Sequence, residues 1–195
     1  GVCYNLINLY EAAIYADMPD EAFEFEQLVF NQIQKLDSPV FKALTITDIA
    51  YMKLVTEDYE SAKENYLVAL DLLRNKDQLN SELEVMTGLA HADLYLGNRH
   101  EARTWIDPIY QKIVEDEGWI LEASLSLHSL WILYKLLIDS DQQLALSLIT
   151  TAYNKLKLII NQIESIADKR SLLETNPIYL YILEGNEEVE MLTAS

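Results

Sequence analysis

The chain has 195 residues, half of them hydrophobic, and its 14 Lys and Arg against 32 Asp and Glu give a formal net charge of −18. This apolar content supports a folded core, and the negative charge argues against direct binding to the phosphate backbone of nucleic acid. The acidity fits either a solvated outer face or the steering of a basic partner.

The cysteine content and the start of the chain say something about its setting. Cys3 is the only cysteine, so an internal disulfide and a cysteine-rich metal site are excluded, and a reducing, cytoplasmic compartment is expected. The chain opens on Gly1, and helical periodicity is already present over residues 4–14. We therefore expect a fragment of a larger protein, without a signal peptide.

Taken in order, the chain predicts four pairs of helices. The first pair is expected over 2–16 and 20–36, with Asp17 as a cap and Pro19 in the first turn, where a missing N–H costs little. The second pair is expected over 38–55 and 59–74, opened by Ser38 as the cap and Pro39 as the first helical residue.

The third pair follows a polar connection at 75–80. Ser81 and Glu84 have the spacing of a capping box and predict its start, and Gly97 predicts the end of its first helix. Pro108 lies within its second helix and should bend that helix near its middle, because proline removes a helical hydrogen bond.

The fourth pair is expected over 119–138 and 142–167, after a break at 115–118. The segment 119–138 is apolar enough to be weighed as a membrane span, but charged residues interrupt it, and a core helix is the better interpretation. Pro177 should end one helix, and 178–183 should form a short capping helix before an acidic tail at 187–190. No membrane association is expected.

The turns between paired helices repeat. Each turn is followed by an alanine at the same relative position, and these alanines lie 40, 40 and 43 residues apart. They are Ala22, Ala62, Ala102 and Ala145. Such a period indicates stacked helical repeats, which we expect over residues 1–37, 38–78, 79–117 and 118–167. A C-terminal cap is expected over residues 168–195, and the whole chain is expected to form one domain.

The turn at Gly97, with Glu101 and Ala102 four and five residues later, resembles the second half of the tetratricopeptide repeat signature. The period is longer than the roughly 34 residues of that repeat and reaches the HEAT range of about 40–47. The resemblance implies an all-α fold, a right-handed α-solenoid of four antiparallel helix pairs with a C-terminal capping helix.

A second resemblance concerns the closing segment. Arg170, Ser171, Leu172 and Leu173, followed by Pro177 and by Ile182 and Leu183, resemble the Arg-Ser-Phe-Leu, Pro and Ile-Leu positions that close the tetratricopeptide arrays of large bacterial signalling ATPases. The aromatic residue of that family is Leu172 here. The resemblance implies a scaffold or sensor module at the C-terminal end of a multidomain ATPase or transcriptional regulator, in contact with a protein segment or with domains N-terminal to Gly1.

Two other classes of function stay open. Quorum-sensing transcription factors carry similar arrays as peptide-sensing domains, and a DNA-binding domain before Gly1 would favour that alternative, whereas a phosphate-binding loop there would favour the ATPase. An enzyme is not expected, because the five glycines are isolated and form no phosphate loop. His91 and His100 lack the spacing of a helical metal site, and Cys3 has no basic neighbour to activate it, so no metal or cofactor is expected.

The predicted ligand surface is the concave face, which the first helix of each pair lines in tetratricopeptide arrays. Positions eleven residues before each turn alanine are Glu11, Tyr51, His91 and Tyr134; those fifteen before are Ile7, Thr47, Thr87 and Leu130; those eight before are Ile14, Leu54, Leu94 and Leu137. None is Lys, Arg or Asn, which excludes the family members' capture of a terminal carboxylate.

These columns allow two interpretations. Either they form an open groove, whose aromatic side chains and acidic rim at Glu11 and Glu84 favour a peptide with basic flanks, or they pack on one another inside a tight supercoil.

Overall fold

The computed structural model describes residues 1–115 and 126–193, and this part of the chain contains ten α-helices and no strand. The prediction of an all-α fold is confirmed. The helices are α1 Val2–Tyr15, α2 Pro19–Ile33, α3 Pro39–Val55, α4 Tyr59–Leu73, α5 Leu79–Tyr95, α6 Arg99–Glu115, α8 Leu127–Leu137, α9 Gln142–Gln162, α10 Ile166–Thr175 and α11 Pro177–Thr193.

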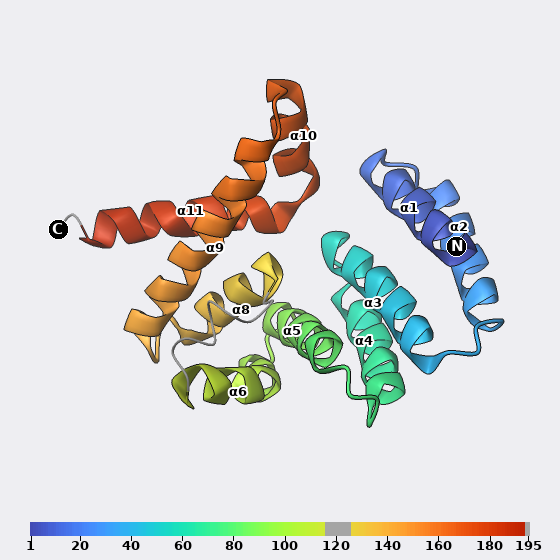
Figure 1. Cartoon of the computed structure of the whole chain (residues 1–195), viewed down its shortest axis with the longest axis horizontal. Coiled ribbons are helices and arrows are strands. Elements are labelled where there is room, and N and C mark those ends of the chain that lie inside the picture. The colour runs from blue at the N-terminus through green and yellow to red at the C-terminus, as the bar shows by residue number, and fades with distance from the viewer. Residues whose placement is uncertain (116–125, 194–195) are drawn as a thin grey trace. The chain divides into compact units, whose positions relative to one another are not determined.

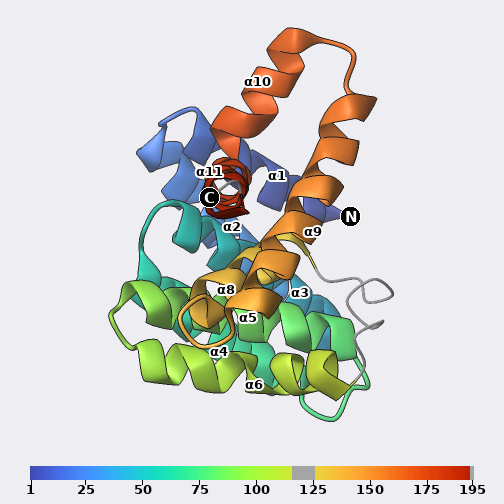
Figure 2. The same ribbon diagram turned by 90° about the vertical axis from the view of Figure 1, so that its left-hand side faces the viewer.

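The helices form two compact units, Gly1–Trp105 and Ile106–Ser195, whose boundary lies within α6. In the first unit α1 packs on α2, α3 on α4 and α4 on α5, while α1, α3 and α5 also contact one another in sequence (Figure 1). In the second unit α8 packs on α9, and α11 contacts α8, α9 and α10 (Figure 2). Helices that are neighbours in the sequence are therefore neighbours in space, as helical repeats require.

The three turns that end α1, α3 and α5 share one backbone geometry. Asp17, Glu57 and Gly97, each 40 residues from the next, have positive φ values of 55°, 60° and 82°. The next residue then donates its N–H to a carbonyl five residues earlier, at 2.9, 2.9 and 2.8 Å. This is the Schellman ending, which satisfies carbonyls that the helix leaves open.

The alanine after each turn also repeats. Ala22, Ala62 and Ala102 each donate their N–H to the carbonyl four residues earlier at 2.9 Å, and all three side chains are buried. Small side chains at these positions let the helix lie close to its neighbours. The forty-residue repeat inferred from the sequence is thus also a repeat of the backbone hydrogen bonds.

The fourth turn has a different geometry. The N–H groups of Ser140 and Asp141 both donate to the carbonyl of Leu137, at 2.9 and 2.7 Å, and positive φ does not occur there. Ala145 is again buried and donates to the carbonyl of Asp141 at 2.9 Å. The longer offset of 43 residues therefore coincides with a different backbone geometry of the turn. The buried alanine after the turn and its hydrogen bond are nevertheless the same as in the other three repeats.

Two predicted caps are wrong. Asp17 occupies the left-handed position that ends α1, and the residue that precedes α2 is Met18, whose side chain makes no capping bond. The expected capping box at Ser81 and Glu84 also fails, because α5 begins at Leu79 and Ser81 lies inside its first turn. The predicted starts at Pro39, with Ser38 accepting the N–H of Phe41 at 3.4 Å, and at Tyr59 are confirmed.

The expected bounds of the last helices also need correction. The helix predicted over 119–138 begins at Leu127, because Ser126 is extended and accepts the N–H of Ser129 at 3.0 Å; its residues 119–125 lie outside the described part. The helix predicted to reach residue 167 ends at Gln162, where Ile163 becomes extended. The helix expected to end before Pro177 is α10, and from Pro177 the chain forms the 17-residue α11 where a short capping helix over 178–183 was predicted.

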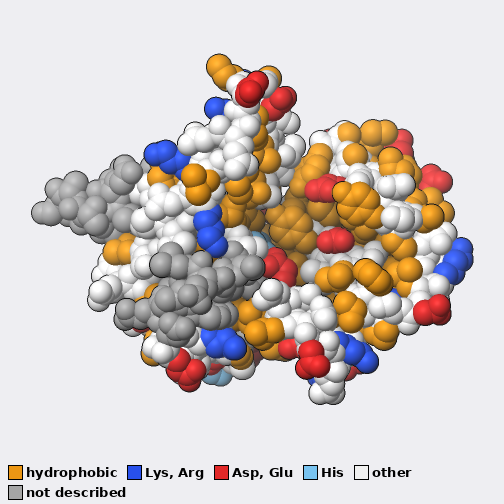
Figure 3. Space-filling view, in the orientation of Figure 1, with side chains coloured by type: hydrophobic (Ala, Val, Ile, Leu, Met, Phe, Trp, Pro, Cys, Tyr) orange, Lys and Arg blue, Asp and Glu red, His pale blue; other side chains and the backbone are white. Residues whose placement is uncertain are grey.

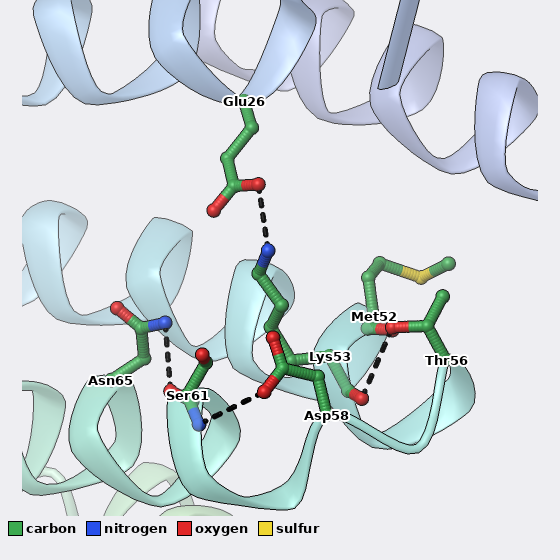
Figure 4. Close-up of polar contacts among 7 residues, drawn as sticks. All are labelled: Glu26, Met52, Lys53, Thr56, Asp58, Ser61 and Asn65. Carbon is green, nitrogen blue, oxygen red and sulfur yellow. Dashed lines mark hydrogen bonds and ion pairs between the residues drawn. The ribbon is translucent and has the colours of Figure 1, made fainter. Parts of the chain in front are cut away.

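Ion pairs join successive helix pairs in the first unit. Lys53 of α3 donates to Glu26 of α2 at 2.7 Å (Figure 4), and Lys63 of α4 donates to Asp93 of α5 at 2.6 Å. Positions 53 and 93 are 40 residues apart and correspond in the repeat, yet they carry opposite charges. Each pair thus ties the second helix of one repeat to the first helix of the next.

Candidate functional site

The residues expected to line the ligand groove divide by burial. Ile7, Leu54, Thr87, His91, Leu130 and Tyr134 are buried, whereas Glu11, Thr47, Tyr51 and Leu94 are partly exposed. Leu130 and Tyr134 belong to the second unit and the other eight to the first. A ligand therefore has little access to six of the ten side chains, and binding at the other four stays a prediction.

His91 and Tyr134 are packing residues. His91 lies 5.0 Å from the ring of Tyr95 and 6.2 Å from that of Tyr59, and the two tyrosine rings stack at 5.1 Å, so these three rings join α4 to α5. In the second unit, Tyr134 of α8 lies against Gly185 of α11, where a Cβ would be 3.4 Å from its ring. Substituting either residue would disturb the fold, which makes both poor probes of binding.

The first unit contains a cavity of about 570 Å³, which we call the α1–α3 cavity. Its lining includes Val2, Tyr4 and Ile7 of α1, Lys35 just after α2, and Phe41, Leu44 and Asp48 of α3. Ligand pockets usually measure about 300–1,000 Å³ and are largely apolar. This is therefore the candidate site.

The apolar lining of the α1–α3 cavity is unusually exposed. Tyr4 is 68% exposed and Phe41 is 64% exposed, and Val2 and Leu44 also expose much of their surface. On the face of the first unit that Figure 3 shows, hydrophobic and acidic side chains lie side by side. Large apolar side chains that gather around a hollow mark a binding surface more strongly than isolated ones do.

Sequence reasoning missed this cavity, apart from Ile7. Phe41, Leu44 and Asp48 follow one another at three and four residues, so they share one face of α3. That spacing was available in the sequence, but it does not reveal that α1 and the end of α2 leave a hollow in front of this face. On α3, the columns counted from the turn alanines fall on a neighbouring face of the helix and not on the face that lines this cavity.

Asp48 supplies the negative charge in the lining of the α1–α3 cavity. Its side chain is exposed to the cavity, but the surrounding protein partly desolvates the carboxyl group, and this burial, with the negative charge of Glu11, raises the pKa of Asp48 to about 6. The pKa of the buried Tyr66 of α4 is also raised, by burial and then by Glu84, Tyr51 and Asp48. Negative charge from Asp48 of α3 and Glu11 of α1 thus meets at the cavity.

Asp48→Asn should raise the melting temperature, by about 1–4 °C at pH 8 and by less at pH 5. The folded-state pKa of Asp48 is raised from 3.8 to about 6, so the folded protein favours the protonated carboxyl group. The stability that this protonated form provides is complete below pH 3.8 and is lost as the pH rises through 6, where the charged carboxylate becomes unfavourable and a neutral Asn does not. The measurement is thermal unfolding by circular dichroism. Glu24→Gln, which removes an exposed carboxylate of α2, is the control, and an unchanged or lower value at pH 8 for Asp48→Asn would contradict the expectation.

A second, smaller cavity of about 250 Å³ lies between α1, α2 and the end of α3. Tyr10, Phe23, Glu26 and Lys53 are among its lining residues. Here the carboxylate of Glu26 already binds Lys53, which leaves Asp17 as the other charged residue of the lining. It offers less to a charged ligand than the α1–α3 cavity does.

The described residues contain no group of three or more His, Cys, Asp or Glu side chains placed to hold a metal ion. His128 of α8 is buried, and burial lowers its pKa to about 4, so the ring is neutral at pH 7. None of the helices in the described ranges is both long and apolar enough to cross a bilayer.

Comparison with protein-family models, with curated proteins and with solved structures gives no match for this chain. The tetratricopeptide resemblance therefore depends on the residues and turns described above.

Proposed function

We propose that this protein is a non-catalytic interaction or sensor module, built as a right-handed, tetratricopeptide-like α-solenoid, that binds a segment of another protein or of its own polypeptide. The repeated turns at Asp17, Glu57 and Gly97 support the solenoid, because they place successive first helices in register. The resemblance of the segment 170–183 supports a place at the C-terminal end of a multidomain signalling ATPase or transcriptional regulator.

One observation carries the binding proposal, namely the α1–α3 cavity with its exposed apolar lining. Rigid helices hold Tyr4 and Phe41 at its edge, and aromatic side chains on such supports give a large contact area at low entropic cost. The cavity lies on the side of the first unit where α1 and α3, the first helices of two successive repeats, contact each other. First helices of this kind line the ligand face in tetratricopeptide arrays.

Phe41→Ala is expected to remove at least about nine tenths of the partner protein that the wild-type chain retains, as loss of an aromatic hot-spot residue does. The measurement is quantitative mass spectrometry of proteins retained by the immobilised wild type and variants. Phe23→Ala is the matched control, because Phe23 is also 64% exposed but lies on α2, away from this cavity.

Partners retained by both wild type and Phe23→Ala but lost by Phe41→Ala would support the proposal. If Phe41→Ala retains the same proteins in the same amounts, the α1–α3 cavity is not the binding surface. Circular dichroism of each variant shows whether helicity is intact.

A further inference from the structure

The lining of the α1–α3 cavity changes along α3 from apolar to acidic. Phe41 and Leu44, one helical turn apart on α3, expose apolar surface, and Tyr4 of α1 does so across from them. One turn further along α3, Asp48 places a carboxylate at the same cavity. A ligand that fills this hollow thus meets an apolar surface and a carboxylate about one or two helical turns apart.

The charges around Asp48 are mostly negative. Glu11 of α1 is close enough to affect its ionisation. Asp48 itself, and Glu84 of α5, both raise the pKa of Tyr66 of α4. Lys35, just after α2, is the positively charged side chain among the residues that line the cavity. The carboxylates Glu26 and Asp93 elsewhere in the unit bind Lys53 and Lys63, whereas Asp48 stands next to another acid.

This arrangement favours a cation that arrives from outside. A carboxylate that is partly desolvated beside a second carboxylate carries unfavourable energy, and an ammonium or guanidinium group relieves it. The apolar surface beside it favours a large aliphatic or aromatic group on the same ligand. A free polyamine would leave that apolar surface uncovered, and an uncharged apolar ligand would offer the Asp48 carboxylate no opposite charge.

We propose that the α1–α3 cavity binds a linear protein segment in which a Lys or Arg residue stands next to a large apolar residue, the cation at Asp48 and the apolar side chain on Phe41 and Leu44. This inference rests on the proposed function, that the protein binds a protein segment, and specifies the chemistry of that segment. Glu11 strengthens the attraction for the cation from α1 without lining the cavity.

The test uses two fluorescein-labelled probes, the peptide Ser-Arg-Phe-Arg-Leu-Ser and the same peptide with Glu at both Arg positions, titrated with the whole chain by fluorescence anisotropy. The wild type should bind the Arg peptide at least about tenfold more tightly than the Glu peptide. Asp48→Asn should weaken Arg-peptide binding about fivefold to tenfold, and Glu24→Gln less than about twofold. The Glu24 control measures what the loss of any one negative charge does to a chain of net charge −18.

Two further readouts separate this site from general attraction. Arg-peptide affinity of the wild type should fall between pH 8 and pH 5, as Asp48 takes up a proton beside Glu11, Lys35, Tyr66 and Glu84; in Asp48→Asn this fall should be smaller. Phe41→Ala should weaken binding of the Arg peptide, while Phe23→Ala should not.

Binding of both peptides with equal affinity, or of neither, overturns the inference. So does equal weakening by Asp48→Asn and Glu24→Gln, which would mean that the peptide follows the overall charge. In each of these cases the proposed function is still tested separately, by comparing the partners retained by the wild type and by Phe41→Ala. Failure of the peptide inference can therefore be distinguished from failure of the proposed function.

Discussion

Asp93→Ala is expected to lower the free energy of unfolding by about 2–4 kcal/mol, because it removes a buried carboxylate that accepts hydrogen bonds from three side chains. The side chain of Asp93 is 0% exposed, and its Oδ1 accepts bonds from Lys63 Nζ at 2.6 Å and Asn98 Nδ2 at 3.0 Å. Its Oδ2 accepts a bond from the indole Nε1 of Trp105 at 2.9 Å. One carboxylate thus joins α4, α5 and the first turns of α6.

The pKa of Asp93 indicates which form the fold requires. Burial alone would raise it, but hydrogen bonds from Lys63, Asn98 and Trp105 and the charge of Lys63 outweigh burial, and the pKa is lowered from its ordinary value of 3.8. The stabilisation is therefore present above pH 3.8 and is lost as the pH falls through the lower, folded-state pKa. Asp93→Asn keeps the shape without the charge and should cost less than Asp93→Ala.

The matched control is Asp71→Ala. Asp71 also pairs with a cation, Arg74, at 3.2 Å, but both side chains are more than two thirds exposed, and such surface pairs contribute about 0–1 kcal/mol. Urea denaturation followed by circular dichroism measures both variants. If Asp93→Ala and Asp71→Ala shift the unfolding midpoint by the same small amount, the buried network does not hold these helices together.

Most of the helices were predictable because their signals are local. Pro19, Ser38 with Pro39, and the repeated turn alanines indicated the starts of α2, α3 and α4 within a residue or two. The prediction of Asp17 as a cap failed because its backbone conformation does not follow from the side-chain preference for cap positions. Asp17 and Glu57 adopt positive φ although they are not glycine, and the same position was recognised only where it was Gly97.

The candidate site was much less predictable. The column positions were correct as places on the first helices, but burial of His91 and Tyr134 depends on which side chains of other helices meet them. The α1–α3 cavity requires α1, the end of α2 and one face of α3 together, and no local pattern encodes the space they leave. A sequence repeat predicts which residues form the helices and which helices are neighbours. A cavity depends instead on the side chains of several helices that together leave a space unfilled.

Gly88 shows how much can depend on one side chain that is missing. Gly88 lies inside α5, where glycine normally costs about 1 kcal/mol relative to alanine, so alanine would be expected to stabilise this helix. The structure reverses that expectation. A Cβ at Gly88 would overlap the ring of Tyr66 of α4, and Tyr66 is only 1% exposed, so the ring has no solvent to move into.

Gly88→Ala is therefore expected to destabilise the first unit by about 2–3 kcal/mol, because the overlap outweighs the gain in helix propensity. Gly185→Ala is the control within another helix, where the nearest atoms, Cδ1 and Cγ1 of Ile149, are 3.1 Å away and need to shift by only a few tenths of an ångström. It should change stability by less than about 1 kcal/mol. Urea denaturation by circular dichroism measures both.

A second substitution tests whether Tyr66 is the cause. The overlapping atoms are Cζ and the two Cε atoms of its ring, which phenylalanine keeps and leucine lacks. In the Gly88→Ala background, Tyr66→Leu should therefore cost less than it does alone, whereas Tyr66→Phe should restore nothing. Additive costs for Gly88→Ala and Tyr66→Leu would show that the two residues do not meet, and that α4 and α5 approach each other elsewhere.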